Sequence, residues 1–265
     1  MSEMLKRILV AALLIPPALV MLWQGGWWLV AGLGAISILC AWEYVGMLRR
    51  TAYQPGWHWV LLAPALYLGL VLLPGWEPVL MGGAFVLAIM EGLADRDRER
   101  CLPRAALSFW GMVVTAALPA LCARLGLLQQ PPKALFWLVL LIWSADTAAY
   151  FVGMKWGRRR GLFPVSPNKS REGFAAGALV PFILVIILYY AGLVPDLPAL
   201  LAAAFAAGIV GQLGDLAESM LKRFAGVKDS SGLFPGHGGM LDRVDSVLLA
   251  GAFLYCALMI LTKVR

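Results

Sequence analysis

The chain is built from long apolar runs separated by short polar segments, and this alternation limits what it can fold into. Each run is close to the roughly 17 to 25 residues that a transmembrane helix needs. Only 14% of the 265 residues are charged, whereas a soluble domain carries about 25%. We therefore expect an all-α polytopic membrane protein with about nine transmembrane helices, near residues 8–24, 27–48, 58–74, 79–93, 106–125, 134–152, 174–191, 197–216 and 247–262.

The lysines and arginines lie mostly in alternate connecting segments. Such asymmetry is typical of the cytoplasmic side of a membrane, so the net charge of +7 indicates topology and not nucleic-acid binding. With the N-terminus inside, the charged segments face the cytoplasm, and the short connections suit a bacterial inner membrane. The four cysteines show no C-x-x-C spacing, which argues against a zinc site.

The two halves of the chain are expected to play different parts. Residues 1–133 form N-terminal transmembrane helices that we interpret as a scaffold. Residues 134–265 hold dense charged clusters in and beside apolar runs, so we expect the catalytic region there, with a polar cavity facing the cytoplasm. Small residues at 202–208 permit close helix packing, either within the chain or between two copies in a homodimer.

The segment 219–245 combines cations, carboxylates, a histidine and several glycines between two apolar runs. Charged groups are costly near a bilayer, so such a cluster indicates a functional site. On the preceding helix, Asp215, Glu218, Ser219 and Lys222 share one face because they follow at i, i+3, i+4 and i+7. This face is either a structural Asp–Lys pair or the wall of a polar cavity. The cavity is favoured because the helix leads directly into the charged segment.

Asp242 and Asp245 stand at i and i+3 just before the last apolar run. Converging carboxylates suit a magnesium ion that also holds substrate phosphates. The alternative is an ordinary acidic start of a helix, where carboxylates suit the helix dipole. The metal–phosphate interpretation is favoured by the flanking side chains Lys222, Arg223, Lys228, His237 and Arg243.

The stretch Pro235–Gly239 is a glycine-dense loop. Glycines such as Gly238 and Gly239 let the backbone approach a ligand and present its N–H groups to anions. The only other histidine in the chain is His58. We therefore expect His237 to contact phosphate and not to bind a metal.

A second polar cluster lies between Asp146 and Gly173. Asp146 sits within a predicted span, where an aspartate usually faces a cavity or a partner. In the loop that follows, 158–160 is interpreted as a topology signal. Lys169 and Arg171 are interpreted as ligands of a substrate phosphate.

These motifs resemble the phosphatidate cytidylyltransferases, also called CDP-diacylglycerol synthases. The main block is Ser219-x-x-Lys222-Arg223-x4-Lys228-Asp229-x5-Pro235-Gly236-His237-Gly238-Gly239-x-x-Asp242-Arg243-x-Asp245. Three shorter motifs extend the resemblance over the C-terminal half: Gln212-x-Gly214-Asp215-x-x-Glu218-Ser219, Asp146-Thr147-x-Ala149-Tyr150 and Ser166-Pro167-x-Lys169. The family pattern usually has two adjacent lysines where this chain has Asn168 and Lys169.

The resemblance implies a reaction of CTP with phosphatidate that gives CDP-diacylglycerol and pyrophosphate and requires Mg²⁺. It leaves open whether a second cation takes part. The metal ligands that it implies, together with the chemistry of carboxylates, are Asp215, Asp242 and Asp245. The implied catalytic residues are Asp215, Lys222, Arg223, Lys228, Asp242 and Arg243. The implied substrate-binding residues are Asp146, Lys169, Arg171, Ser219, His237, Gly238 and Gly239.

Two other functions fit the sequence less well. A transporter of an anionic solute would suit Asp146 and Asp215, but no internal repeat is visible and the charge gathers on one side. A CDP-alcohol phosphotransferase would need an aspartate-rich motif that starts with Asp-Gly, and this chain lacks it.

Overall fold

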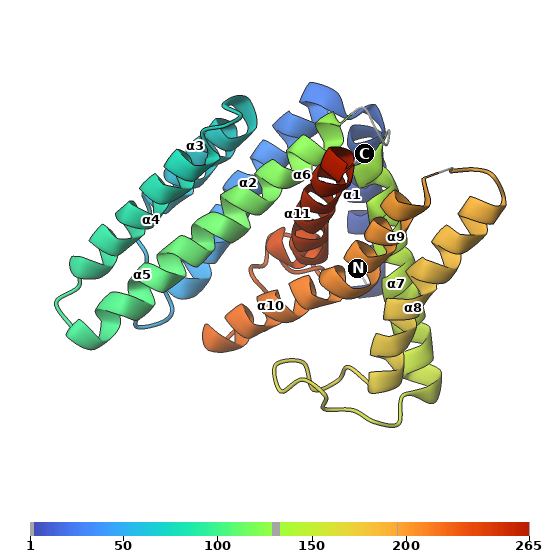
Figure 1. Cartoon of the computed structure of the whole chain (residues 1–265). Helices are drawn as coiled ribbons and strands as arrows, with labels where there is room; N and C mark the ends of the chain where they lie inside the picture. Colours follow the sequence, from blue (N-terminus) through green and yellow to red (C-terminus); the bar gives the residue numbers. More distant parts are fainter. Residues whose placement is uncertain (1–2, 129–132, 195, 265) are drawn as a thin grey trace. The chain divides into compact units, whose positions relative to one another are not determined.

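The computed structural model describes residues 3–128, 133–194 and 196–264, and this part of the chain is helical with no β-strand (Figure 1). The prediction of an all-α protein is confirmed. The elements in chain order are α1 (Glu3–Gln24), α2 (Gly26–Leu48), α3 (Trp59–Leu72), α4 (Glu77–Leu93), α5 (Arg98–Met112), η1 (Val113–Ala117), α6 (Leu118–Leu127), α7 (Ala134–Trp156), α8 (Arg171–Tyr190), α9 (Leu197–Phe205), η2 (Ala206–Val210), α10 (Gly211–Phe224) and α11 (Leu241–Val264).

Within the described residues, six helices are long and apolar enough to cross a membrane. Two of them, 98–127 and 197–224, contain the single π-helical turns η1 and η2. Shorter apolar helices occupy Ala12–Gln24 and Trp59–Leu72. Each predicted apolar run thus falls largely within helix, but the count of nine spans is not confirmed. Among the predicted spans, α3 has 14 residues and α4 has 17, which is short for a bilayer of about 30 Å.

The chain divides into two compact units. One contains residues 1–124 and 222–243, and the other contains residues 125–221 and 244–265. The predicted boundary at 133/134 separates a scaffold from a catalytic region, and this division of roles stays a prediction. Residues 222–243, which include most of the charged segment, belong to the same unit as the N-terminal helices.

In the first unit, helices α2 to α5 lie side by side (Figure 1). Buried hydroxyl groups tie the helices together, because a polar atom in an apolar interior needs a hydrogen-bond partner. The Tyr67 hydroxyl of α3 donates to the Val30 carbonyl of α2 at 2.7 Å. The Tyr44 hydroxyl of α2 donates to the Leu107 carbonyl of α5 at 2.7 Å. These bonds link α2 to α3 and to α5.

In the second unit, helices α7 and α8 lie side by side (Figure 1), and small residues allow them to pack closely. A Cβ atom at Gly173 would lie 2.7 Å from the Ala149 carbonyl oxygen and 3.1 Å from the Cα of Gly153. Similarly, a Cβ atom at Gly214 of α10 would lie 2.7 Å from the Asp245 carbonyl oxygen of α11. Glycine at these positions allows the helix backbones to touch, as in membrane helix pairs. The crossing at Gly214 brings the next residue, Asp215, beside the first turns of α11.

Candidate functional site

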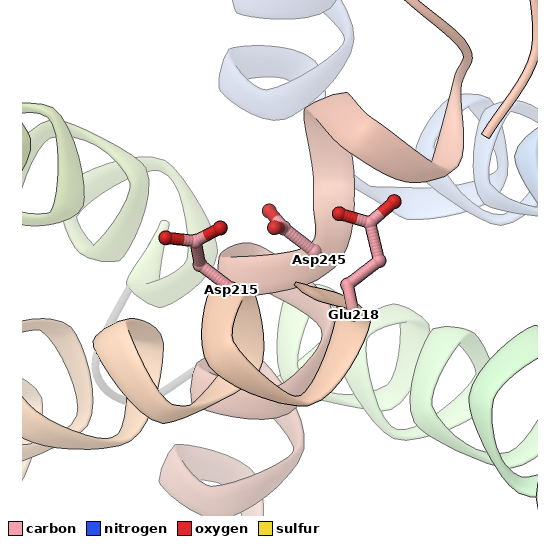
Figure 2. A group of neighbouring side chains, drawn as sticks. All are labelled: Asp215, Glu218 and Asp245. Carbon is pink, nitrogen blue, oxygen red and sulfur yellow. The ribbon is translucent and has the colours of Figure 1, made fainter. Parts of the chain in front are cut away.

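Three carboxylates gather in the second unit, where α10 meets α11 (Figure 2). Asp215 and Glu218 stand one turn apart on α10, and Asp245 comes from α11. One carboxylate oxygen from each lies within 4.8 Å of the other two. Glu218 is buried, with 6% of its surface exposed. Negative charges held this close repel one another, and the cluster therefore attracts cations.

The cluster fits a divalent cation. Mg²⁺ is bound by oxygen ligands, and in nucleotide enzymes it typically takes one or two carboxylates together with substrate phosphates. Asp215, Glu218 and Asp245 supply oxygen donors from two helices whose crossing is fixed by Gly214. The prediction of a metal site is thus supported in its coarser form, an acidic cluster able to hold a metal ion.

A cavity of about 480 Å³ lies beside this cluster in the second unit. Its polar wall includes Asp146, Lys169 and Asp215, and the Lys169 ammonium forms an ion pair with the Asp215 carboxylate. Tyr150 and Met154 provide an apolar wall and are both largely exposed. We call it the α7–α8 cavity; its full lining is Asp146, Ala149, Tyr150, Gly153, Met154, Arg160, Asn168, Lys169, Ser170, Gly173, Phe174, Gln212 and Asp215.

Local sequence explains how Lys169 reaches this cavity. The next residue, Ser170, is the N-cap of α8, and its hydroxyl accepts a hydrogen bond from the Gly173 N–H at 3.1 Å. Serine is favoured at this position because it satisfies an N–H group that the helix leaves unpaired. The preceding loop is closed by a bond from the Arg171 N–H to the Arg159 carbonyl at 2.9 Å. Lys169 is therefore held between a closed loop and a capped helix.

A second cavity, of about 490 Å³, belongs to the first unit and is formed by residues 228–243. We call residues 228–240 the glycine loop. Lys228, His237 and Arg243 contribute cationic or potentially cationic groups to the cavity, and Gly236 and Gly238 contribute backbone. Both glycines have positive φ, of 78° and 77°, which a residue with a side chain rarely adopts. A tight turn results, in which the His237 N–H donates to the Phe234 carbonyl at 2.8 Å.

Asp242 fixes the glycine loop from the first turn of α11. Its carboxylate accepts hydrogen bonds from the Ser230 N–H, the Ser230 hydroxyl and the Gly239 N–H, each at 2.8 Å. The Lys222 ammonium pairs with it at 2.6 Å, and the two side chains are only 12% and 5% exposed. Four partners therefore surround Asp242, which organises the loop and leaves little of its acceptor capacity for other ligands.

Comparison with known proteins identifies the family to which the chain belongs. The model of the cytidylyltransferase family matches residues 5–261. The chain belongs to the cytidylyltransferase family. A protein of Pseudomonas aeruginosa named phosphatidate cytidylyltransferase is 37% identical over 264 residues, which cover 92% of this chain and 93% of that protein.

Two further relatives with the same name are similar. The protein of Brucella suis is 33% identical over 269 residues, covering 96% of this chain and 93% of its own length. The protein of Bacillus subtilis is 46% identical over 125 residues, which are 46% of this chain and 45% of that protein. The cytidylyltransferase match thus extends over nearly the whole chain, including the helices interpreted as a scaffold.

The structure distributes the predicted site residues of this cytidylyltransferase over three groups. In the second unit, Asp146, Lys169 and Asp215 line the α7–α8 cavity, and Asp215 and Asp245 join the acidic cluster. In the first unit, Lys222 pairs with Asp242, and the glycine loop and its flank hold Lys228, His237, Gly238, Gly239 and Arg243. The roles predicted for all of these residues remain predictions.

Three predicted residues in the described part of the chain belong to none of these groups. Arg171 is exposed at the first position of α8, and Ser219 is half-buried on α10. Arg223 is exposed, and its guanidinium donates to the Val227 carbonyl at 3.2 Å. Their substrate contacts also remain predictions.

Sequence reasoning left three residues out of the candidate site. Glu218 completes the acidic cluster, and its spacing of three residues from Asp215 was the signal. Arg160 lines the α7–α8 cavity, although its position among three arginines suggested only topology. Glu43 contacts the glycine loop from α2. A carboxylate inside a predicted span is a signal that could have identified it.

Proposed function

We propose that this cytidylyltransferase transfers the cytidylyl group of CTP to phosphatidate, forming CDP-diacylglycerol and pyrophosphate. The α7–α8 cavity carries the proposal, because it combines the Lys169 ammonium with an apolar wall that includes Tyr150 and Met154. Such a combination suits a ligand with an anionic head and a hydrocarbon body. The names of the relatives and the six helices able to cross a membrane support a lipid substrate.

The reaction is an exchange of phosphorus–oxygen bonds. An oxygen of the phosphatidate phosphate forms a bond to the α-phosphorus of CTP. The bond from that phosphorus to the α,β-bridging oxygen breaks, and its electron pair leaves with pyrophosphate. A phosphate monoester is largely ionised near neutral pH, so no general base is needed. Catalysis then consists mainly of positioning the substrates and stabilising charge.

The lipid phosphate is assigned to Lys169. In the structure its ammonium pairs with Asp215, and a doubly charged phosphate in the α7–α8 cavity would compete for the same ammonium. Arg160 lines the same cavity and supplies a second cation. Asp146, on the same wall, disfavours anions close to it and so restricts where the phosphate can bind.

The triphosphate of CTP is assigned to the glycine loop. Lys228, His237 and Arg243 line its cavity, and Gly236 and Gly238 contribute backbone to the same lining. A nest of N–H groups with nearby cations binds phosphate oxygens. Asp242 supports this role indirectly, since it holds the Ser230 and Gly239 N–H groups that shape the loop.

The acidic cluster would hold the Mg²⁺ ion through Asp215, Glu218 and Asp245. When bound, the ion supplies positive charge that neutralises phosphate oxygens during the transfer. This assignment differs from the sequence-based set, because Glu218 joins it and Asp242 is engaged with Lys222. The three carboxylates would hold the ion from their positions on α10 and α11.

We further propose that the protein resides in a bacterial inner membrane with its site facing the cytoplasm, where CTP is available. The cation asymmetry of the connecting segments and the bacterial relatives support this location. A homodimer and a second cation remain predictions from the sequence.

Labelled CTP tests the proposed reaction. The purified protein in detergent is supplied with phosphatidate, Mg²⁺ and CTP labelled at either the α- or the γ-phosphate. Cytidylyl transfer places the α label in lipid and the γ label in pyrophosphate. The γ label in lipid would indicate phosphoryl transfer, and release of both labels without a lipid product would indicate hydrolysis. Either of the last two results would overturn the proposal.

A further inference from the structure

A buried carboxylate on α2 contacts the glycine loop from far away in the sequence. Glu43 is only 1% exposed, and no lysine or arginine among the described residues forms an ion pair with it. A carboxylate without a counter-ion is costly to bury unless hydrogen bonds satisfy its oxygens. The position of Glu43 therefore has to be explained by the groups that donate to it.

Four donors from residues 230–241 surround Glu43, two on each oxygen. Oε1 accepts from the Ser231 hydroxyl at 2.7 Å and from the Met240 N–H at 2.8 Å. Oε2 accepts from the Leu241 N–H at 2.8 Å, and it lies 3.0 Å from the Ser230 hydroxyl, whose one proton it shares with Asp242. One carboxylate therefore binds both ends of the segment between Ser230 and Leu241.

Two features show that the loop is shaped around this carboxylate. The Met240 and Leu241 N–H groups lie at the start of α11, where a helix leaves its first N–H groups unpaired and favours a negative charge. Glu43 satisfies both from another helix. In addition, a Cβ atom at Gly239 would overlap the Glu43 carboxylate and the Ser230 hydroxyl. Glycine at 239 thus allows the carboxylate to reach the backbone.

We infer that Glu43 is a positioning residue for nucleotide binding: it ties both ends of the glycine loop and so holds Lys228, His237 and the loop N–H groups in place for the triphosphate. The inference rests on the proposed function, which assigns the triphosphate to this loop. It gives the N-terminal helices, interpreted from the sequence as a scaffold, a direct part in the site.

The variant Glu43→Gln tests this inference with almost no change in shape. The Ser230 and Ser231 hydroxyls can rotate to accept from an amide NH₂ group, but a backbone N–H cannot. Whichever way the new amide turns, its NH₂ group faces either the Met240 or the Leu241 N–H. One buried donor is then left unsatisfied, so we expect kcat/KM for CTP to fall about 10- to 100-fold. The KM for phosphatidate should stay within about twofold.

The chain offers a control in Glu91, a second buried carboxylate of the same unit, which unlike Glu43 also forms an ion pair, with Arg104 at 3.4 Å. Glu91 accepts from the Gly56 N–H at 2.6 Å and the Ser108 hydroxyl at 2.7 Å, and it also contacts the Trp59 indole N–H. None of these donors belongs to the glycine loop. Glu91→Gln should therefore lower the melting temperature without changing the KM for CTP.

Hydrogen exchange provides a readout that does not depend on turnover. The Met240 and Leu241 amides should exchange faster in Glu43→Gln than in the wild type, and at the wild-type rate in Glu91→Gln. If Glu43→Gln fails to fold, Ser231→Ala removes a single donor and should reduce kcat/KM for CTP in the same direction by a smaller factor.

The outcomes separate this inference from the proposed function. An active wild type whose Glu43→Gln variant keeps the wild-type KM for CTP and the wild-type exchange rates would overturn the role of Glu43. A wild type that binds CTP without forming a lipid product would overturn the proposed function instead. In that case, CTP affinity and the exchange rates of the two variants still decide whether Glu43 positions the loop.

Discussion

Replacing Glu218 by glutamine should weaken magnesium binding without unfolding the protein. Glu218 is buried within 4.8 Å of oxygens from Asp215 and Asp245. At that separation two unit charges repel by about 3 kcal/mol for an effective dielectric constant of about 20. The substitution removes two of the three carboxylate–carboxylate repulsions, so the metal-free variant should remain folded.

With magnesium the same substitution has the opposite effect. A bound divalent cation is attracted to all three carboxylates, and the variant loses one of these three charged ligands. A net loss of only about 1.4 kcal/mol corresponds to a tenfold weaker affinity. We therefore expect the Mg²⁺ concentration for half-maximal activity to rise at least about tenfold.

Two measurements detect the weaker magnesium binding. Initial rates of CDP-diacylglycerol formation are recorded over a range of Mg²⁺ concentrations, and the melting temperature is recorded with Mg²⁺ and with EDTA. The magnesium-dependent rise in melting temperature should shrink in Glu218→Gln. Glu172→Gln is the control, because Glu172 lies in the same unit on α8 and outside the cluster. An unchanged Mg²⁺ requirement in Glu218→Gln would refute the assignment of the acidic cluster.

Two further predictions concern the second unit. Lys169→Met removes the cation paired with Asp215 in the α7–α8 cavity. The KM for phosphatidate should therefore rise about tenfold or more, while the KM for CTP changes little. Steady-state kinetics in mixed micelles measures both constants, and equal changes in the two would contradict the lipid-phosphate role of Lys169. Gly214→Ala would place a Cβ atom 2.7 Å from the Asp245 carbonyl oxygen, which should cost about 1 to 3 kcal/mol of stability and weaken magnesium binding. Gly82→Ala, where nothing lies within 4 Å, is the control in thermal unfolding.

Much of the helical architecture could be predicted from apolar runs. The predicted span 27–48 corresponds to α2, Gly26–Leu48, because a glycine turn precedes it and arginines follow it. The predicted span 106–125 belongs to a longer helical stretch that begins at Arg98, since its first turns are polar and hydropathy does not detect them. The Asp97 side chain caps this helix by accepting from the Glu99 N–H, so the capping pattern would have revealed the start.

The candidate site was only partly predictable for a different reason. Charges near apolar runs reveal that residues 219–245 are functional, but they do not reveal which groups the charges contact. Ser230 lies 187 residues from its partner Glu43, and Asp242 pairs with Lys222 although its spacing from Asp245 suggested a shared metal. Both contacts depend on tertiary packing. The carboxylate of Glu43 was visible within a predicted span, yet its donors were not.

The central claim is that this membrane cytidylyltransferase joins CTP to phosphatidate. The most direct test is ³¹P NMR of the purified protein in mixed micelles with CTP, phosphatidate and Mg²⁺. The account predicts that CDP-diacylglycerol and pyrophosphate appear in equal amounts, and that EDTA stops both. If CTP is consumed without an equal amount of CDP-diacylglycerol, or if neither product forms with Mg²⁺ present, the account is contradicted.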